Sequence, residues 1–502
     1  MNLKKKLIPA LIAPLALGLS FSGQALANDS DELEKLRSLV QELDQKVRIL
    51  DRKGELADEA ATEKKKVTPI VKASQDGFGL ESADGQNKIK FKALAQIDYR
   101  SYVNRSNQTA NIDGFDFRRI RPSVEGTVFG IYDFKFVPEF GENKTSGIAP
   151  VAADGLIKKS SSNSGIVDAY IDARFKPWFQ VRAGKFKPYV GLERQQSGAD
   201  TKFIERSYVS NNILPNRDLG VSVHGDLFGD KLTYAVGVFN GVVDGGDNVT
   251  SQDLNGDKDF AARLFTTPFK GEDSLLAGLG FGIAATHTNT NGPSNYGSIT
   301  SGLPDYKTPG QQASFFTYSS GTAAQGVRNR WAPQAYYYYG PFGVLAEYAQ
   351  VDQHIYNSGN ANNKAASLSN DAWHVTASWL ITGEDASFKG IKPKNVFNPD
   401  GAGWGAWEIV ARYQENNIDN AAFSTGSNGA NTFFADPTTA SKSAESWAIG
   451  INWYLNQNIK IATDYEQTSF KWGGGGTKTA TSISALDRAD EKTLFTRLQV
   501  SY

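Results

Sequence analysis

Regular alternation of apolar and polar residues constrains this chain more than any other feature of its sequence. Positions 494, 496, 498, 500 and 502 are mostly apolar, whereas the positions between them are mostly polar. A period of two is typical of a β-strand with one apolar face and one polar face. The same pattern recurs from residue 88 to the end of the chain, so the sequence predicts an all-β fold.

The connections between these segments alternate between short and long along the chain. Outer-membrane barrels show this alternation because their periplasmic turns are short and their outer loops are long. An aromatic residue at the end of the chain, here Tyr502, is typical of the last strand of such barrels. The sequence therefore predicts a sixteen-stranded antiparallel transmembrane β-barrel over residues 88–502, with its apolar face toward lipid. The predicted strands are 88–103, 115–129, 130–140, 165–176, 178–186, 218–228, 231–240, 259–268, 277–288, 331–339, 341–351, 370–381, 404–415, 445–455, 458–470 and 491–502.

The first residues indicate export. Three lysines at positions 4–6 precede an apolar run over residues 7–19, and the small residues Ala25 and Ala27 suit a signal peptidase. The run is short and is broken by two prolines, which argues against a membrane anchor. We expect residues 1–27 to be a cleaved signal peptide, and the mature protein to lie in the outer membrane of a Gram-negative bacterium.

Residues 28–52 are predicted to form a coiled-coil helix. Six apolar residues between 31 and 52 recur at spacings of three and four, with charged residues between them. So short a helix is marginal in water unless other helices share its apolar seam. The segment could therefore associate with copies of itself or lie on the barrel. Residues 53–87 are charged and poor in aromatic residues, and are predicted to be a linker.

The composition excludes several classes of function. The 53 basic and 54 acidic residues leave a net charge of −1, which gives no general attraction for nucleic acid. The chain has no cysteine, so disulfides, thiolate metal sites and thiol nucleophiles are excluded. Its four histidines have no metal-binding spacing, and no set of catalytic residues converges. We expect neither enzymatic activity nor a cofactor or metal ion.

The stretch 114–140 holds the first candidate functional residues. In the predicted strand, Arg119 and Arg121 share the inward face, whereas Arg118 has the lipid-facing parity and lies near the outer rim. Arginines in a pore attract anions, and the planar guanidinium suits phosphate or carboxylate oxygens. Alternatively, these arginines could pair with acidic residues of neighbouring strands and brace the wall.

A second group of cations lies in the long connection between residues 185 and 217. This segment carries six basic and three acidic residues, an excess of three positive charges. It could fold inward and narrow the pore, or it could be an ordinary solvated outer loop. A different connection, 382–403, is long where the pattern predicts a short turn, and nothing in the sequence assigns it a role. The six basic residues are Lys185, Lys187, Arg194, Lys202, Arg206 and Arg217.

Several stretches resemble the phosphate-selective outer-membrane porins of the O and P type. They are "RRIRPSVEGTVFGIYDFKF" (118–136), "VDAYIDARF" (167–175), "VRAGKFKPYVGLE" (181–193), "PNRDLGV" (215–221) and "GAWEIVARY" (405–413). The resemblance implies a homotrimer of barrels in which arginines and lysines line an anion path and the third outer loop forms the constriction. By this resemblance, the anion path would involve Arg118, Arg119, Arg121 and the six basic residues of 185–217.

The chain departs from this family in its arginines. Phosphate-selective members carry a ladder of lumen arginines, whereas Arg119 and Arg121 make only two rungs here. The predicted function is passive diffusion of small anions, with phosphate as one candidate. The alternatives are a general or otherwise selective solute porin, and a structural outer-membrane protein that is anchored to peptidoglycan or another envelope component through residues 31–52.

Overall fold

The computed structural model describes residues 29–74, 77–103, 113–141, 165–246, 256–290, 302–310, 314–357, 364–424, 434–478 and 482–502. The predicted signal peptide lies outside these residues. The chain divides into two compact units, one up to Thr68 and the other from Pro69 to the end. The first contributes a single helix and the second a β-barrel, and each is described by itself.

Helix α1 spans Asp29–Val67. It continues beyond the predicted end at residue 52, through part of the predicted linker, because residues 53–67 are mostly alanine, glutamate and lysine, which favour helices. It ends shortly before Pro69, where a helical backbone is disfavoured. The heptad side chains are exposed, with 67% of Leu36 and 66% of Leu50 accessible. Among the described residues, no helix is long and apolar enough to cross a membrane.

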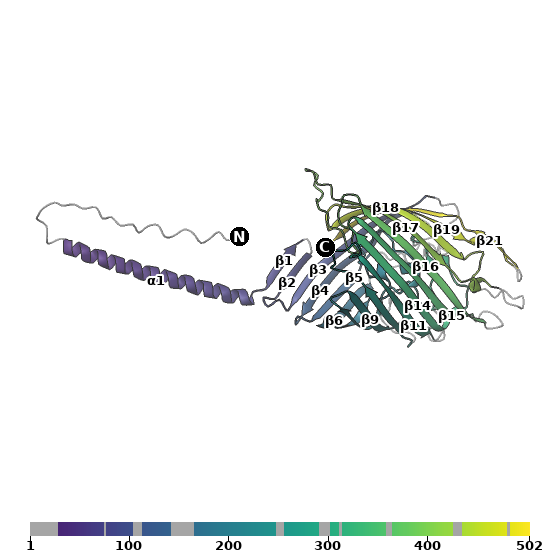
Figure 1. Cartoon of the computed structure of the whole chain (residues 1–502), viewed down its shortest axis with the longest axis horizontal. Coiled ribbons are helices and arrows are strands. Elements are labelled where there is room, and N and C mark those ends of the chain that lie inside the picture. Colours follow the sequence, from purple (N-terminus) through teal and green to yellow (C-terminus); the bar gives the residue numbers. More distant parts are fainter. Residues whose placement is uncertain are drawn as a thin grey trace, which may run out of the picture. The chain divides into compact units, whose positions relative to one another are not determined.

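Sixteen strands of the second unit form a closed antiparallel barrel, as the sequence predicts (Figure 1). The barrel closes where the last strand pairs with the first, with Leu498 opposite Ile97 and Val500 opposite Ala95. The strands are β3 (Lys88–Tyr102), β4 (Gly114–Val128), β5 (Tyr132–Glu139), β6 (Gly165–Lys176), β7 (Phe179–Phe186), β8 (Asp218–Leu227), β9 (Leu232–Phe239), β10 (Asp259–Thr266), β11 (Leu279–Thr290), β14 (Thr322–Tyr339), β15 (Phe342–Asn357), β16 (Lys364–Leu380), β17 (Ala406–Asn417), β18 (Ser443–Tyr454), β19 (Ile459–Lys471) and β22 (Glu491–Ser501).

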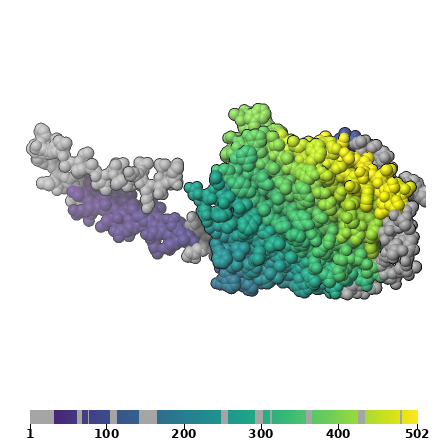
Figure 2. All heavy atoms as spheres, turned by 45° about the vertical axis from the view of Figure 1, so that its right-hand side comes forward, coloured from purple at the N-terminus to yellow at the C-terminus, as the bar shows by residue number. Residues whose placement is uncertain are grey.

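The side chains alternate between the two faces of this wall. On β17, Glu408, Arg412 and Gln414 are buried in the lumen, whereas Ile409 and Tyr413 are exposed on the outside. Aromatic pairs lie on the outer face at two levels, one at the short-turn ends of the strands and one about halfway along them, as at the two boundaries of a lipid layer. Examples are Trp407 with Trp453, Trp373 with Tyr413, and Trp331 with Tyr348. In the space-filling view the colour changes gradually across the wall because strands adjacent in sequence are adjacent in space (Figure 2).

Three strands extend further toward the long loops than the sequence predicts. β14 begins at Thr322 rather than at 331, β15 continues to Asn357, and β16 begins at Lys364 rather than at 370. Outward positions among the added residues, such as Asp352 and His354, are polar, whereas inward positions such as Ile355 and Leu368 are apolar and buried. Without an apolar outer face the expected alternation is lost, so the pattern could not find these ends.

A hairpin precedes the barrel in the segment predicted as linker. Its strands are β1 (Ile70–Ser74) and β2 (Gly77–Glu81), and β2 pairs with the beginning of β3, where Phe78 lies opposite Phe91. The Tyr502 ring lies 5.9 Å from the Phe78 ring, measured between centroids. Backbone hydrogen bonds also join Tyr502 to Ala93, so β2 and β22 lie end to end along the same edge of β3.

The tight turn between β4 and β5 shows how the short connections form. Phe129 and Gly130 have φ angles of 52° and 72°. Positive φ at both central residues is the geometry of a type I′ turn, which matches the twist of the two strands. Glycine adopts this conformation without strain, and Phe129 is held in it by a hydrogen bond from its N–H to Asn87 Oδ1.

Deleting residues 29–68 is expected to leave the barrel assembled, because this segment contributes no strand and the pairing of β22 with β3 remains. The heat-dependent shift in electrophoretic mobility and the β-type circular dichroism in detergent measure this. Deletion of residues 29–81 serves as the comparison, since it also removes β2 and uncovers one edge of β3. A barrel that fails to form without α1 would contradict the division into two units.

Candidate anion path in the lumen

The long connection 187–217 lies inside the barrel. It contains a short helix, α2 (Leu192–Gln195), and one turn of π-helix, η1 (Val209–Ile213). Gln334 on β14 donates a hydrogen bond to the carbonyl of Val190, and Gln96 on β3 donates to that of Gly198. Asn452 on β18 donates to the carbonyl of Lys202. Because these strands belong to different parts of the wall, the connection crosses the lumen and is not a solvated outer loop.

The start of α2 is anchored to the wall by Glu347. This carboxylate accepts hydrogen bonds from the N–H groups of Leu192 and Glu193 at 2.5 and 2.9 Å, and His374 Nε2 lies 3.4 Å from it. The Glu193 carboxylate in turn accepts from Ser207 and Ser210. Burial raises the pKa of Glu193, but the opposing effects of His374, Arg412 and the Ser210 hydroxyl are larger together. The pKa of Glu193 is therefore lowered to about 2.

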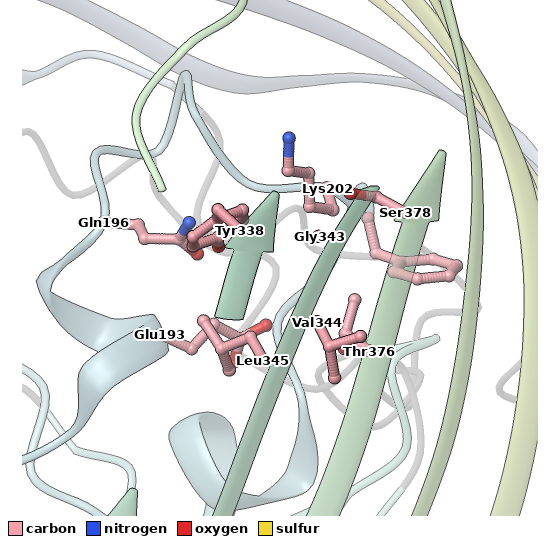
Figure 3. Close-up of a pocket in the computed structure, with 10 residues that line it drawn as sticks. Glu193, Gln196, Lys202, Tyr338, Gly343, Val344, Leu345, Thr376 and Ser378 are labelled. Carbon is pink, nitrogen blue, oxygen red and sulfur yellow. The ribbon is translucent and has the colours of Figure 1, made fainter. Parts of the chain in front are cut away.

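Glu193, Glu347 and His374 place one potential metal ligand each within 4.8 Å of one another. Their carboxylates already accept backbone and hydroxyl hydrogen bonds, and Arg412 lies 3.9 Å from Glu193. A nearby guanidinium opposes the binding of a cation. We therefore assign this cluster to anchoring the loop. Beside it, Glu193 and Gln196 face Thr376 and Ser378 of β16 across a cavity of about 10 Å³, which is enough for one water molecule (Figure 3).

Glu205 also anchors the loop, and one of its partners is Arg118. The prediction that Arg118 has the lipid-facing parity is therefore wrong. The register of β3 and β4 shifts between Gln96 and Ile97, so a bulge at Arg118 interrupts the alternation. The bulge turns Arg118 from the expected lipid face into the lumen, where its Nε lies 2.7 Å from Glu205. Arg100 on β3 binds the same carboxylate at 2.7 Å. The two guanidinium groups hold the pKa of Glu205 well below its usual range despite its burial.

Among the described contacts, four of the nine predicted cations pair with carboxylates. Besides Arg118, Arg121 pairs with Glu139 on β5, Lys202 with Glu408 on β17, and Arg217 with Asp168 on β6. The contact distances are 2.6, 2.6 and 2.9 Å. These residues brace the wall and the loop, which is the alternative that the sequence left open for Arg121.

Other predicted cations bind uncharged oxygens. Arg119 donates to the Gln96 side chain at 2.6 Å. Lys187 and Arg206 both donate to the carbonyl oxygen of Gln196, at 2.7 and 2.8 Å. Two cations therefore converge on a single neutral atom. Arg194 donates to the carbonyl of Ser210.

Lys185 does not share this environment. It lies opposite Ala169, which is opposite Phe136, so its position has the parity of the outer face, although its side chain is buried. Its neighbours Phe186 and Lys187 line the lumen instead. Strand β7 thus separates Lys185 from the anion path that the sequence proposed for it.

A cavity of about 630 Å³ lies between the loop and the wall. We call it the basic cavity because, among the residues that the structure describes, eight basic and three acidic side chains line it, an excess of five positive charges. Burial and the neighbouring Arg206 and Arg217 hold the pKa of Lys187 well below its usual range, and an anion beside it would raise that pKa and stabilise the ammonium form. Like charges at this density favour the entry of an anion. The charged lining residues are Lys92, Arg121, Lys135, Arg182, Lys187, Arg217, Lys389 and Lys392, with Glu125, Asp168 and Asp200.

The connection between β16 and β17 forms one side of the basic cavity. The carbonyl of Phe388 accepts a hydrogen bond from Gln196 of the loop at 2.8 Å, and its ring stacks on Tyr336. These contacts place Lys389 and Lys392 at the cavity. The connection that is too long for a turn therefore reaches inward from the rim of short turns and meets the loop.

Comparison with known proteins identifies the family. The model of the family described as phosphate-selective porin O and P matches residues 89–494. The chain belongs to this family. This porin is thus an outer-membrane channel and not an enzyme. It is 24% identical over 423 residues to Porin O of Pseudomonas aeruginosa, covering 79% of this chain and 86% of that protein.

Solved structures of other outer-membrane channels are similar to this porin. The channel DcaP of Acinetobacter baumannii matches with a TM-score of 0.48 and 10% identity, covering 85% of this chain and 99% of that one. An anion-selective porin from Comamonas acidovorans matches with a TM-score of 0.46 and 10% identity, covering 83% of this chain and all of that one.

Sequence reasoning missed several lumen arginines of this porin. Arg328 and Arg330 on β14 bind Asp259, and Arg330 also binds Asp244. They fell in a predicted outer loop because the start of β14 was placed too late. Other arginines lay on the polar face of predicted strands. They were not named as candidates for the anion path, although strand parity places them in the lumen. These are Arg100, Arg182, Arg263, Arg412 and Arg497.

Glu205→Gln is expected to destabilise the barrel by about 3–5 kcal/mol, because two buried guanidinium groups lose their carboxylate. Denaturant unfolding in detergent measures this. The folded pKa of Glu205 is depressed, so its contribution is present above about pH 4.5 and is lost as the pH falls through the folded value. Asp230→Asn, which breaks an exposed pair with Lys270, is the matched control. Equal stability of the two variants at pH 7 would contradict the anchoring role.

Proposed function

We propose that this porin lets small anions diffuse passively through the basic cavity and past the loop 187–217. The excess of five positive charges in the cavity lining carries this proposal. A fixed charge inside a low-dielectric wall is screened less than one at the surface, so a few residues can dominate permeation. Phosphate is one such anion, as the family's description suggests.

The balance of charges in the lumen limits the expected selectivity. Arg121 and Arg217 line the basic cavity but each contacts a carboxylate. Lys187, Lys389 and Lys392 line the same cavity without a carboxylate contact among the described residues. Three such lysines favour anions as a class more than phosphate in particular. If Arg121 and Arg217, which are paired with carboxylates, add no positive potential in the cavity, selectivity for anions is weaker. The alternative function, a general or otherwise selective porin, would then follow.

The reversal potential under a salt gradient tests the proposal. We expect the wild type to prefer anions, and Lys187→Gln to roughly halve the permeability ratio of anion to cation, because it removes a charge from the cavity. Lys185→Gln is the matched control: it makes the same change two residues away on the outer face. The difference should shrink at 1 M salt, where the Debye length is about 3 Å.

A cation-selective wild type would overturn the proposed anion path. An equal effect of the two lysine substitutions would show that the cavity does not determine selectivity.

We infer further that three chains associate, as the family resemblance implies, and that α1 takes part. Leu36, Val40, Leu43 and Leu50 form an exposed apolar seam on α1, which other copies of the helix could cover. Around the seam, α1 carries exposed ion pairs such as Lys46 with Glu42. These charged faces would remain available for contact with peptidoglycan. Export would require cleavage of the signal peptide after Ala27.

Replacing Leu43 and Val47 with aspartate is expected to weaken association of the full-length chain, because the seam would then hold like charges. Cross-linking and sedimentation in detergent measure the fraction of associated chains. Arg48→Asp, on an exposed face of the same helix, is the control and should not change it. If the seam variant associates as strongly as the wild type, α1 does not contribute to the assembly.

A further inference from the structure

We propose that the basic cavity is a binding site for organic carboxylates with an aromatic or comparably apolar body. This inference rests on the proposed function and names the class of anion that the cavity holds best. The size of the cavity, its apolar lining and a stacked arginine each support it.

The size of the basic cavity exceeds what a single inorganic ion needs. Its volume of about 630 Å³ falls within the roughly 300–1,000 Å³ of pockets that bind drug-sized ligands. A phosphate or chloride ion would occupy a small part of it and contact only one side. An organic anion could contact the barrel wall and the loop together.

Apolar side chains lie on both sides of the basic cavity. Leu94 on β3 and Val137 on β5 belong to the wall, and Ile391 belongs to the opposite connection between β16 and β17. A path used only by hydrated ions gains nothing from such residues, whereas the apolar part of an organic anion is stabilised by leaving water.

An arginine held among aromatic rings lies at the same wall. The Arg182 guanidinium is 4.4 Å from the centroid of the Tyr170 ring and 5.5 Å from that of Phe186. Its Nε donates to Asp172 at 2.9 Å, which fixes its plane. Tyr170, Arg182 and Phe186 all line the cavity. Planar cationic and aromatic groups stacked together form a surface on which another ring can stack.

Lys187 supplies the charge for the carboxylate. It follows Phe186 directly, so the cation and the aromatic wall lie next to each other in the lining. One of its three N–H donors binds the Gln196 carbonyl, and the ammonium offers two more. A carboxylate that accepts from Lys187 therefore has an aromatic and apolar surface beside it for the rest of the molecule.

Block of chloride current by added anions tests this site. Wild-type protein in planar bilayers is titrated with benzoate, acetate and phosphate. We expect half-block by benzoate at a concentration about tenfold lower than by acetate or phosphate, the factor that one good aromatic contact provides. This comparison needs no variant. If benzoate blocks no better than acetate, the inference is overturned, whereas anion selectivity and the proposed function would stand.

Substitutions locate the contact. Tyr170→Leu should raise the half-blocking concentration of benzoate severalfold and leave that of acetate unchanged, whereas Tyr170→Phe should retain the wild-type value because it keeps the ring. Tyr132→Leu, with its side chain on the outer face of the neighbouring strand, is the matched control. Leu94→Ser, which also changes the lining, should raise the half-blocking concentration of benzoate as well. This variant replaces Tyr170→Leu in the test if Tyr170→Leu does not assemble. Unchanged block by benzoate in both lining variants would place its site elsewhere.

Discussion

The closed pairing of the backbone is the constraint on which the rest of this molecule depends. In a hydrocarbon environment each unpaired N–H or C=O group costs several kcal/mol, so a sheet in the membrane must have no free edge. The pairing of β22 with β3 removes that edge. Once the wall is closed, the alternation along each strand separates lipid-facing residues from lumen residues. The polar side chains of sixteen strands are then confined to one enclosed space.

That confinement determines where the loop lies. Charges such as Glu408 on β17 and Asp98 on β3 are buried, and each needs a partner of opposite sign. The loop 187–217 brings Lys202 to Glu408, and Arg497 of β22 binds Asp98 while donating to the loop carbonyl of Ile204. The ion pairs that stabilise the loop therefore also neutralise most of the lumen. In the proposed function, selectivity depends on the charges that remain without a carboxylate partner among the described residues, and these lie around the basic cavity.

Strand parity predicted the barrel, the strand ends that lie near its apolar outer band, and the inward direction of Arg119 and Arg121. It failed where a local irregularity changes the count, because the bulge at Arg118 turns that side chain inward. Lys185 was assigned to the anion path by the charge of its segment and by resemblance, and its position in β7 has the parity of the outer face. Parity also failed for Arg328, in a stretch without an apolar outer face. The loop contacts could not be predicted, because Lys202 and Glu408 are joined by folding and not by any spacing in the sequence.

A channel must attract its solute without holding it for long, because tight binding stops conduction. Unpaired cations in a low-dielectric lumen would bind anions strongly, and pairing with carboxylates, as for Arg121 with Glu139, weakens that attraction. Apolar contacts act differently, since they add a non-directional stabilisation that depends on the shape and area of the solute. A lumen with partly neutralised cations beside Tyr170 and Val137 can therefore distinguish anions by the size and apolar surface of the solute as well as by its charge. In this proposal, the positive charges attract anions in general, and the apolar lining favours those anions that carry an apolar group.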